Sequence, residues 1–222
     1  MEACATQKTR NNVKNNVATV FNALRFRAGL DDNPFRHVQN AVTSDSVSGR
    51  EFARDEIARL LWLARHTEMY GAILTGAYSG LRWKDICHLR CSMIKDRMLW
   101  RISPSKTARH AMVADLPLHW RVWRHLTWRM DNGNGEWVFP SLHAEYKDKH
   151  RGRFVELLDK AKIDNEGGRI RFHCLRHTFR TWLSQCETRP DIAKKLGGWT
   201  TDISELYNHD YASMSAAINR LK

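Results

Sequence analysis

The sequence lacks several features that would define its surroundings. None of its apolar runs approaches the roughly 18 residues that a membrane-spanning helix needs, and its polar start is unlike a secretory signal. Its five cysteines form no CxxC pair, which leaves neither a disulfide framework nor a zinc-ligand spacing. Cys87 and Cys91 stand near His88, but small buried thiols explain this pair better than a metal site does. We therefore expect a soluble protein of a reducing compartment, without a membrane partner, a metal or another cofactor.

Acidic residues are also scarce. The chain has 24 Asp and Glu against 36 Lys and Arg, a formal net charge of +12 and a pI of about 9.8. Such a surplus of positive charge favours a polyanionic partner, with nucleic acid ahead of an anionic membrane. The 222 residues are 42% hydrophobic, which is enough for the core of one large domain or of one domain with part of another.

Helical periodicity dominates the chain. It predicts helices over residues 9–28, 50–67, 69–78, 83–89, 119–130, 154–161, 175–187, 191–196, 203–207 and 211–221. Alternating patterns predict strands within residues 93–103 with a turn at Lys95–Asp96, a hairpin over residues 105–116, and a short strand at 137–139 that ends at Pro140. The fold class is therefore mixed α/β, mainly helical, with a small antiparallel sheet.

Two segments leave alternatives open. Residues 119–130 carry Trp120, Trp123 and Trp128, and we expect these rings in the core or between helices rather than stacked on bases. The amphipathic helix at 211–221 could dock on a neighbouring subunit or pack on its own domain, and the sequence favours neither.

The stretch from Val42 to Arg50 is typical of a linker because it is rich in Ser and ends in Gly-Arg. A lone helix before a linker indicates the tail of another domain, although the helix could also belong to the main one. We therefore divide the chain into residues 1–40, a domain tail with its linker, and residues 41–222, the main domain.

Three distant clusters could together handle a phosphodiester. Gly80 allows a tight turn before Arg82, which then stands at a helix start where free backbone N–H groups favour an anion. Arg176 follows His173 by three residues, so both side chains project from about the same face of a helix start. The planar fork of each arginine can hold one side of a phosphate. Lys106 could then protonate the leaving hydroxyl while the phenol of Tyr207 attacks.

Five motifs, in this order, resemble those of the tyrosine recombinases of the phage-integrase type. They are SerGlyLeuArgTrpLysAspIle from Ser79, SerLysThr from Ser105 with ValAlaAspLeuProLeu from Val113, HisCysLeuArgHisThrPhe from His173, LeuGlyGlyTrpThr from Leu196, and LeuTyrAsnHis from Leu206. The similarity covers the chain from about Arg50 onward. The segment before it resembles the end of the family's N-terminal core-binding domain, most of which would be absent.

The resemblance assigns a role to each of seven residues. It makes Arg82, His173 and Arg176 the groups that stabilise the transition state, Asp85 their supporting acid, Lys106 the general acid, Trp199 a phosphate contact and Tyr207 the nucleophile. One spacing departs from the family's pattern, since Trp199 precedes Tyr207 by eight residues rather than nine. Tyr211 is the rival nucleophile, but the neighbours of Tyr207 match the family's motif better.

The resemblance implies a site-specific recombinase or integrase of a mobile genetic element. Such an enzyme cleaves and rejoins double-stranded DNA through a 3′-phosphotyrosyl intermediate, without a metal or ATP. Family members act as homotetramers on DNA, although this chain could be a monomer in isolation, and the resemblance implies a bacterial or phage-encoded protein that acts in the cytoplasm at the nucleoid. Two alternatives remain: a non-catalytic DNA-binding regulatory protein with the same fold, and an enzyme like the type IB topoisomerases. A metal-dependent nuclease is less favoured because no tight carboxylate cluster is present in the sequence.

Overall fold

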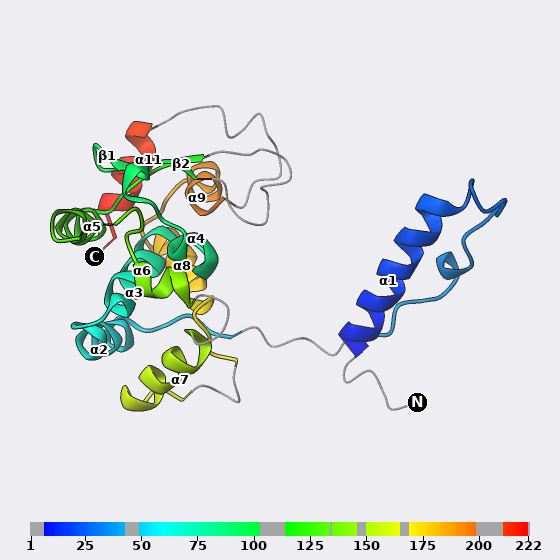
Figure 1. Cartoon of the computed structure of the whole chain (residues 1–222), viewed down its shortest axis with the longest axis horizontal. Coiled ribbons are helices and arrows are strands. Elements are labelled where there is room, and N and C mark those ends of the chain that lie inside the picture. The colour runs from blue at the N-terminus through cyan, green and yellow to red at the C-terminus, as the bar shows by residue number, and fades with distance from the viewer. Residues whose placement is uncertain are drawn as a thin grey trace. The chain divides into compact units, whose positions relative to one another are not determined.

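The chain forms two compact units, residues Met1–Ser48 and Gly49–Lys222. The computed structural model describes residues 7–42, 49–102, 114–133, 135–145, 150–164, 169–198 and 211–221 (Figure 1). Within these ranges, no helix has both the length and the apolar character needed to span a membrane.

The first unit is a single helix with a loop folded back on it. Helix α1 (Gln7–Leu24) ends four residues before the predicted boundary, and Gly29 then takes a positive φ of 62°. The side chain of Asn33 caps the short 3-10 helix η1 (Pro34–Arg36) and donates to the carbonyl of Ala18 at 2.8 Å. Phe35 also packs on Phe21, with ring centroids 5.0 Å apart. These contacts hold the loop against α1.

The second unit is mainly helical, as the sequence predicts. Its helices are α2 (Arg54–Ala64), α3 (Glu68–Ser79), α4 (Trp83–Cys87), η2 (Cys91–Met93), α5 (Trp120–Asp131), α6 (Pro140–Ala144), α7 (His150–Lys160), α8 (Cys174–Gln185), α9 (Pro190–Gly197) and α11 (Tyr211–Asn219). The strands β1 (Ile94–Lys95), β2 (Met98–Ile102) and β3 (Ala114–Pro117) form one antiparallel sheet in the order β1-β2-β3. The predicted helix at 203–207 lies outside the described residues.

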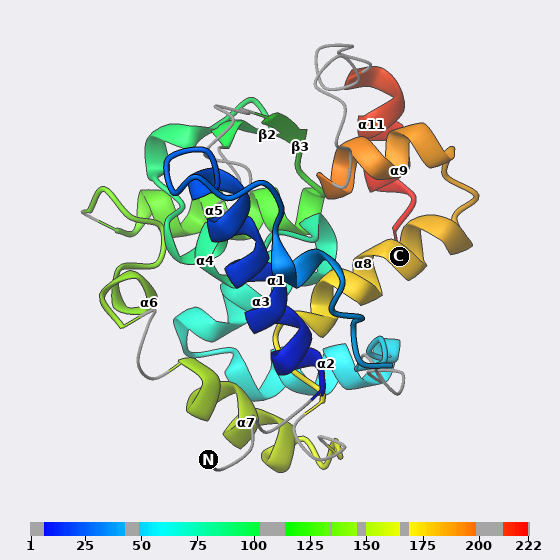
Figure 2. The ribbon, with the colours of Figure 1, turned by 90° about the vertical axis from the view of Figure 1, so that its right-hand side faces the viewer.

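Helix α3 is the centre of the second unit. Every residue from Gly71 to Ser79 is buried, because α2, α5 and α8 all pack against this one helix. A helix that is apolar on all sides is stable only when neighbours cover all of it. Helix α7 lies at one end of the unit, and α9 and α11 lie at the other (Figures 1 and 2).

The small sheet begins with a two-residue turn. Asp96 and Arg97 both have positive φ, 52° and 60°, and Lys95 pairs with Met98 across them. Two successive residues with positive φ are typical of the turns that match the twist of a hairpin. The turn therefore lies one residue beyond the predicted position. Strand β3 pairs with β2 through Leu99 and Leu116, but residues 103–113, which include Lys106, lie outside the described residues.

Two local predictions were wrong. The strand expected at 137–139 is a single bridge between Arg90 and Trp137, and Pro140 begins helix α6 rather than ending a strand. Proline suits the first helical position because its missing N–H has no helical partner there.

The tryptophans of α5 do not form a core stripe: Trp120 and Trp128 are 44% and 57% exposed. Val122 and Leu126 supply the buried face of this helix instead.

Helix α11 packs on its own domain, which answers the question that the sequence left open. Met214, Ala217 and Ile218 are buried against α9 and β3. The neighbouring His119 is 1% exposed and joins the chain end to the start of α5. Its Nε2 lies 3.0 Å from the carbonyl of Leu221, and its Nδ1 accepts from the backbone N–H of Arg121. Because Nδ1 accepts, the ring is neutral with its proton on Nε2.

Lower pH should destabilise the fold through the protonation of His119. Burial lowers the pKa of His119 to about 4 from its ordinary 6.5, so the unfolded chain takes up a proton in that pH window before the folded chain does. The free energy of unfolding should therefore fall as the pH drops from 6.5 toward 4, by an amount on the order of 2 to 3 kcal/mol from this group. Urea unfolding of wild type and His119→Gln across that window measures it. The variant, which keeps a side-chain N–H but cannot titrate, should show a flatter dependence. Equal slopes would contradict the role of His119; the pKa of His125 is also lowered to about 4, so only the difference between the two proteins is informative.

Gly80 should tolerate no side chain. It ends α3 with a positive φ of 64°, and an added Cβ would lie 2.4 Å from Cδ1 of Phe179 in the core. Gly80→Ala should lower the free energy of unfolding by about 2 to 4 kcal/mol, because it combines backbone strain with overpacking. Gly152→Ala is the matched control: Gly152 lies in α7 with no atom within 4 Å of its added Cβ, and alanine there should be neutral or slightly stabilising. Equal stabilities in the two variants would show that the turn at Gly80 is not constrained.

Candidate active site

Arg82 is held at the junction between two helices. Helix α3 ends at Gly80 in the left-handed conformation, and Arg82 then adopts extended backbone angles of −76° and 153° as the N-cap of α4. Its Nη1 lies 4.0 Å from Oδ2 of Asp85, one turn into α4. The Arg82 side chain is 23% exposed and that of Asp85 is 6% exposed, so the acid supports the arginine from the inner side. The sequence prediction of Arg82 at a helix start is confirmed.

Arg176 lies in the first turn of α8 and is almost wholly buried, at 7% exposure. Its Nη1 donates to the carbonyl of Gly80 at 2.6 Å, and its Nη2 donates to the carbonyl of Gly197. A buried guanidinium requires such partners, because an unsatisfied charged donor costs several kcal/mol, roughly. Arg176 therefore joins the ends of α3 and α9.

The charge of Arg82 affects the pKa of Arg176. The pKa of Arg176 falls to about 10, chiefly because the group is buried and next because of the charge of Arg82, while Asp85 acts in the opposite direction. Arg176 remains charged at neutral pH. Among the residues that the structure describes, two guanidiniums thus lie near the carboxylate of Asp85, and such a group of positive charges favours an anion.

His173 is the N-cap residue of α8, one turn before Arg176, and it is exposed. Its ring meets that of His177 edge to face, with centroids 5.2 Å apart. Thr178 has a structural role: its hydroxyl accepts from the backbone N–H of Phe52 at 2.8 Å and donates to the carbonyl of Cys174 at 3.0 Å. The start of α8 thus presents His173 outward while its buried side fixes the chain that enters the domain.

Three of the predicted residues, Lys106, Trp199 and Tyr207, lie outside the described residues. The rival nucleophile Tyr211 is described at the start of α11, where its hydroxyl donates to Oδ2 of Asp115 at 3.2 Å. Burial and this carboxylate both raise the pKa of Tyr211. The phenol of Tyr211 is therefore held by Asp115 in its protonated form.

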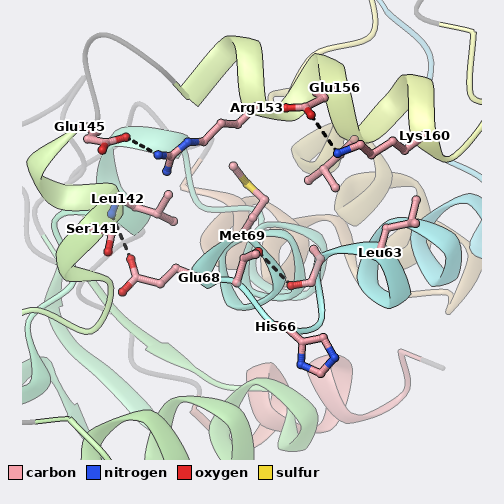
Figure 3. Close-up of a pocket in the computed structure, with 13 residues that line it drawn as sticks. Leu63, His66, Glu68, Met69, Ser141, Leu142, Glu145, Arg153, Glu156 and Lys160 are labelled. Atoms are coloured by element: carbon pink, nitrogen blue, oxygen red, sulfur yellow. Dashed lines mark hydrogen bonds and ion pairs between the residues drawn. The ribbon is translucent and has the colours of Figure 1, made fainter.

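A pocket of about 620 Å³ lies between α2, α3, α6 and α7 (Figure 3). Figure 3 shows two ion pairs along its wall, Arg153 with Glu145 and Lys160 with Glu156, above an apolar floor that includes Met69. Arg82, Asp85, His173 and Arg176, the predicted site residues that the structure describes, do not line it. The candidate site is instead the surface where α4 and α8 begin.

Sequence reasoning missed the groups that hold the site together. The carbonyls of Gly80 and Gly197 bind Arg176, and Asp115 binds Tyr211. Backbone carbonyls leave no mark in a sequence. Asp115 lies in the quoted ValAlaAspLeuProLeu segment, but only the tertiary structure gives it a partner.

Comparison with known proteins supports the same region. The model of the phage integrase family matches residues 51–214. No curated protein sequence matches the chain significantly.

Solved structures share the fold at low sequence identity. The integrase from mycobacterium phage Brujita is 21% identical with a TM-score of 0.61, and the match covers 99% of this chain and 74% of that one. The Tn1549 transposon integrase, solved in complex with circular intermediate DNA, is 18% identical with a TM-score of 0.68 over 97% of this chain and 80% of that one. A lambda integrase dimer bound to a core site is 15% identical with a TM-score of 0.65 over 91% and 75%.

The family match spans most of the chain and includes Arg82, Asp85, His173 and Arg176. The mainly helical fold with its small antiparallel sheet is the one that the resemblance implied. This chain belongs to the phage integrase family and is a tyrosine recombinase.

Proposed function

We propose that this chain cleaves and rejoins double-stranded DNA with Tyr207 as its nucleophile and Arg82, His173 and Arg176 as the groups that hold the scissile phosphate. One observation carries the proposal. Arg82 and Arg176 come from distant parts of the sequence, yet they lie close enough for the charge of Arg82 to lower the pKa of Arg176, and Asp85 lies 4.0 Å from Arg82. A phosphate placed there would relieve the repulsion between them.

The proposed first step is an in-line displacement at phosphorus. The phenolic oxygen of Tyr207 releases its proton to solvent and forms a bond to phosphorus while the bond to the 5′ oxygen of the next nucleotide breaks, which leaves a 3′-phosphotyrosyl linkage. Arg82, Arg176 and His173 stabilise the negative charge that develops on the non-bridging oxygens. Lys106 gives a proton to the departing 5′ oxygen, and Trp199 contacts the phosphate.

Rejoining is the same reaction in reverse. A 5′ hydroxyl attacks the phosphorus and gives its proton to Lys106, the diester forms again, and the phenolic oxygen of Tyr207 leaves and takes up a proton from solvent. Because the phosphotyrosyl linkage keeps the energy of the broken diester, the cycle needs no ATP. Because guanidinium groups supply the positive charge, we also expect it to need no metal.

Solved relatives support the proposed substrate and assembly. The Tn1549 and lambda integrases were solved on DNA, and the lambda enzyme also as a tetramer on a Holliday junction. We propose that this chain likewise acts on double-stranded DNA as a homotetramer and is the recombinase of a mobile genetic element. The net charge of +12 fits such a partner. We further propose that residues 1–40 correspond to the end of a core-binding domain.

Tyr207→Phe should abolish the covalent protein–DNA adduct and leave DNA affinity nearly unchanged, because only the attacking oxygen is removed. The adduct is trapped on a nicked suicide substrate, in buffer with EDTA, and resolved on a denaturing gel. Binding of the same DNA is measured by fluorescence anisotropy. Tyr211→Phe is the matched control and should still form the adduct. An adduct that persists in Tyr207→Phe and disappears in Tyr211→Phe would contradict the choice of nucleophile.

The two arginines should respond differently to the same substitution. Arg82→Gln should slow cleavage on the order of 10²- to 10³-fold with little change in stability, since its nearest acidic group is 4.0 Å away and its side chain is partly exposed. Arg176→Gln should slow cleavage and also lower the free energy of unfolding by about 2 kcal/mol or more, since it loses its bonds to two helix ends.

Single-turnover cleavage at saturating DNA and urea unfolding of the same samples separate the two effects. Wild-type cleavage by Arg82→Gln would remove this residue from the reaction. A destabilisation as large as that of Arg176→Gln would show that Arg82 is structural.

A further inference from the structure

Three polar contacts fasten helix α11 to the sheet side of its own domain. At its first residue, the hydroxyl of Tyr211 donates to Asp115 on β3 at 3.2 Å. At its last residue, Arg97 in the β1–β2 turn donates to Oδ1 of Asn219 at 3.1 Å. Beyond it, the carbonyl of Leu221 meets His119 at 3.0 Å.

Apolar packing lies between these contacts. Met214, Ala217, Ile218 and Leu221 are each 5% exposed or less, and α11 contacts both β3 and α9. Figure 1 shows α11 beside the strands, and both views show it beside α9. The start of α11 is therefore held in place on the domain, and its first residue, Tyr211, is hydrogen-bonded to strand β3.

The covalent chain ties Tyr207 to this point. Tyr211 follows Tyr207 by four positions, and four extended residues span at most about 14 Å. The Cα of Tyr207 must therefore lie within that distance of the Cα of Tyr211. This limit is set by the chain alone and holds for any conformation of the residues between them.

The opposite end of the same segment is tied to the candidate site. Helix α9 ends at Gly198 with a positive φ of 57°, and the preceding carbonyl, that of Gly197, accepts from Arg176. Asp115, which accepts the hydrogen bond of Tyr211, is likewise close in sequence to a proposed catalytic residue. It lies on strand β3, nine residues after Lys106. The Tyr211–Asp115 hydrogen bond thus connects the segment that contains the proposed nucleophile to the segment that contains the proposed general acid.

We propose that Tyr211 and Asp115 are positioning residues, whose hydrogen bond sets the anchor from which Tyr207 reaches the scissile phosphate. The proposal rests on the proposed function and adds a second tyrosine with a distinct task. Tyr211 does not touch the reacting atoms. Its hydroxyl fixes where the segment of Tyr207 ends, and a small displacement of a nucleophile is costly because attack requires alignment with the leaving oxygen.

Single-turnover cleavage at saturating suicide substrate tests the proposal, with the DNA dissociation constant measured in parallel. Tyr211→Phe removes only the hydroxyl and should slow adduct formation roughly ten-fold without changing DNA affinity. Asp115→Ala should slow it by a similar factor, and the double variant should be no slower than either single one. Asp115→Asn keeps an acceptor oxygen for the phenol and should restore the rate to within about two-fold of wild type.

Asn219→Ala is the matched control. It removes a polar contact at the opposite end of the same helix from Tyr211, so it should reduce stability to a similar degree and leave the cleavage rate unchanged. If Asn219→Ala slows cleavage as much as Tyr211→Phe, the effect is general loosening of α11 and the positioning role is wrong. Wild-type cleavage by Tyr211→Phe, or failure of Asp115→Asn to restore the rate, would also overturn it.

The proposed function fails in a different way. In that case wild type forms no adduct, or Tyr207→Phe still forms one. Complete loss of the adduct in Tyr211→Phe, with retention in Tyr207→Phe, would make Tyr211 the nucleophile and contradict both proposals.

Discussion

The site depends on how one buried guanidinium is stabilised. Arg176 donates to carbonyls at the C-terminal ends of α3 and α9, and both helices are ended by a glycine with positive φ, Gly80 and Gly198. The last carbonyls of a helix lack helical partners and carry the negative end of its dipole. They therefore offset part of the cost of burying the positive charge of Arg176.

This arrangement also fixes the geometry around it. Arg82 follows Gly80 by two residues, so the bond that orients Arg176 also sets where the second guanidinium starts. The segment of Tyr207 begins directly after Gly198 and ends at Tyr211, which Asp115 holds. The segment is therefore held at both ends, at Gly198 and Tyr211, and the two guanidiniums are held in place as well. A displacement at phosphorus is faster when the protein positions its reacting groups before the substrate binds.

The sequence predicted what depends on local pattern. The turn at Gly80, the helix starts at Arg82 and His173 and the amphipathic helices follow from spacing and from the special conformations of glycine. It could not predict contacts that depend on tertiary structure. The carbonyl partners of Arg176, the neutral state of His119 between Arg121 and Leu221, and the pairing of Tyr211 with Asp115 each join residues far apart in the chain. The exposed Trp120 and Trp128 were missed because large aromatics usually favour cores.

The central claim is that Tyr207 becomes covalently attached to DNA beside the two arginines. Tandem mass spectrometry of the tryptic peptide from a trapped wild-type adduct, after nuclease digestion, locates the attached nucleotide directly. The account predicts one nucleotide joined through its 3′ phosphate to Tyr207, on the peptide that also contains Trp199 and Tyr211. A nucleotide on Tyr211, or a peptide with no modified tyrosine although DNA has been cut, would contradict it.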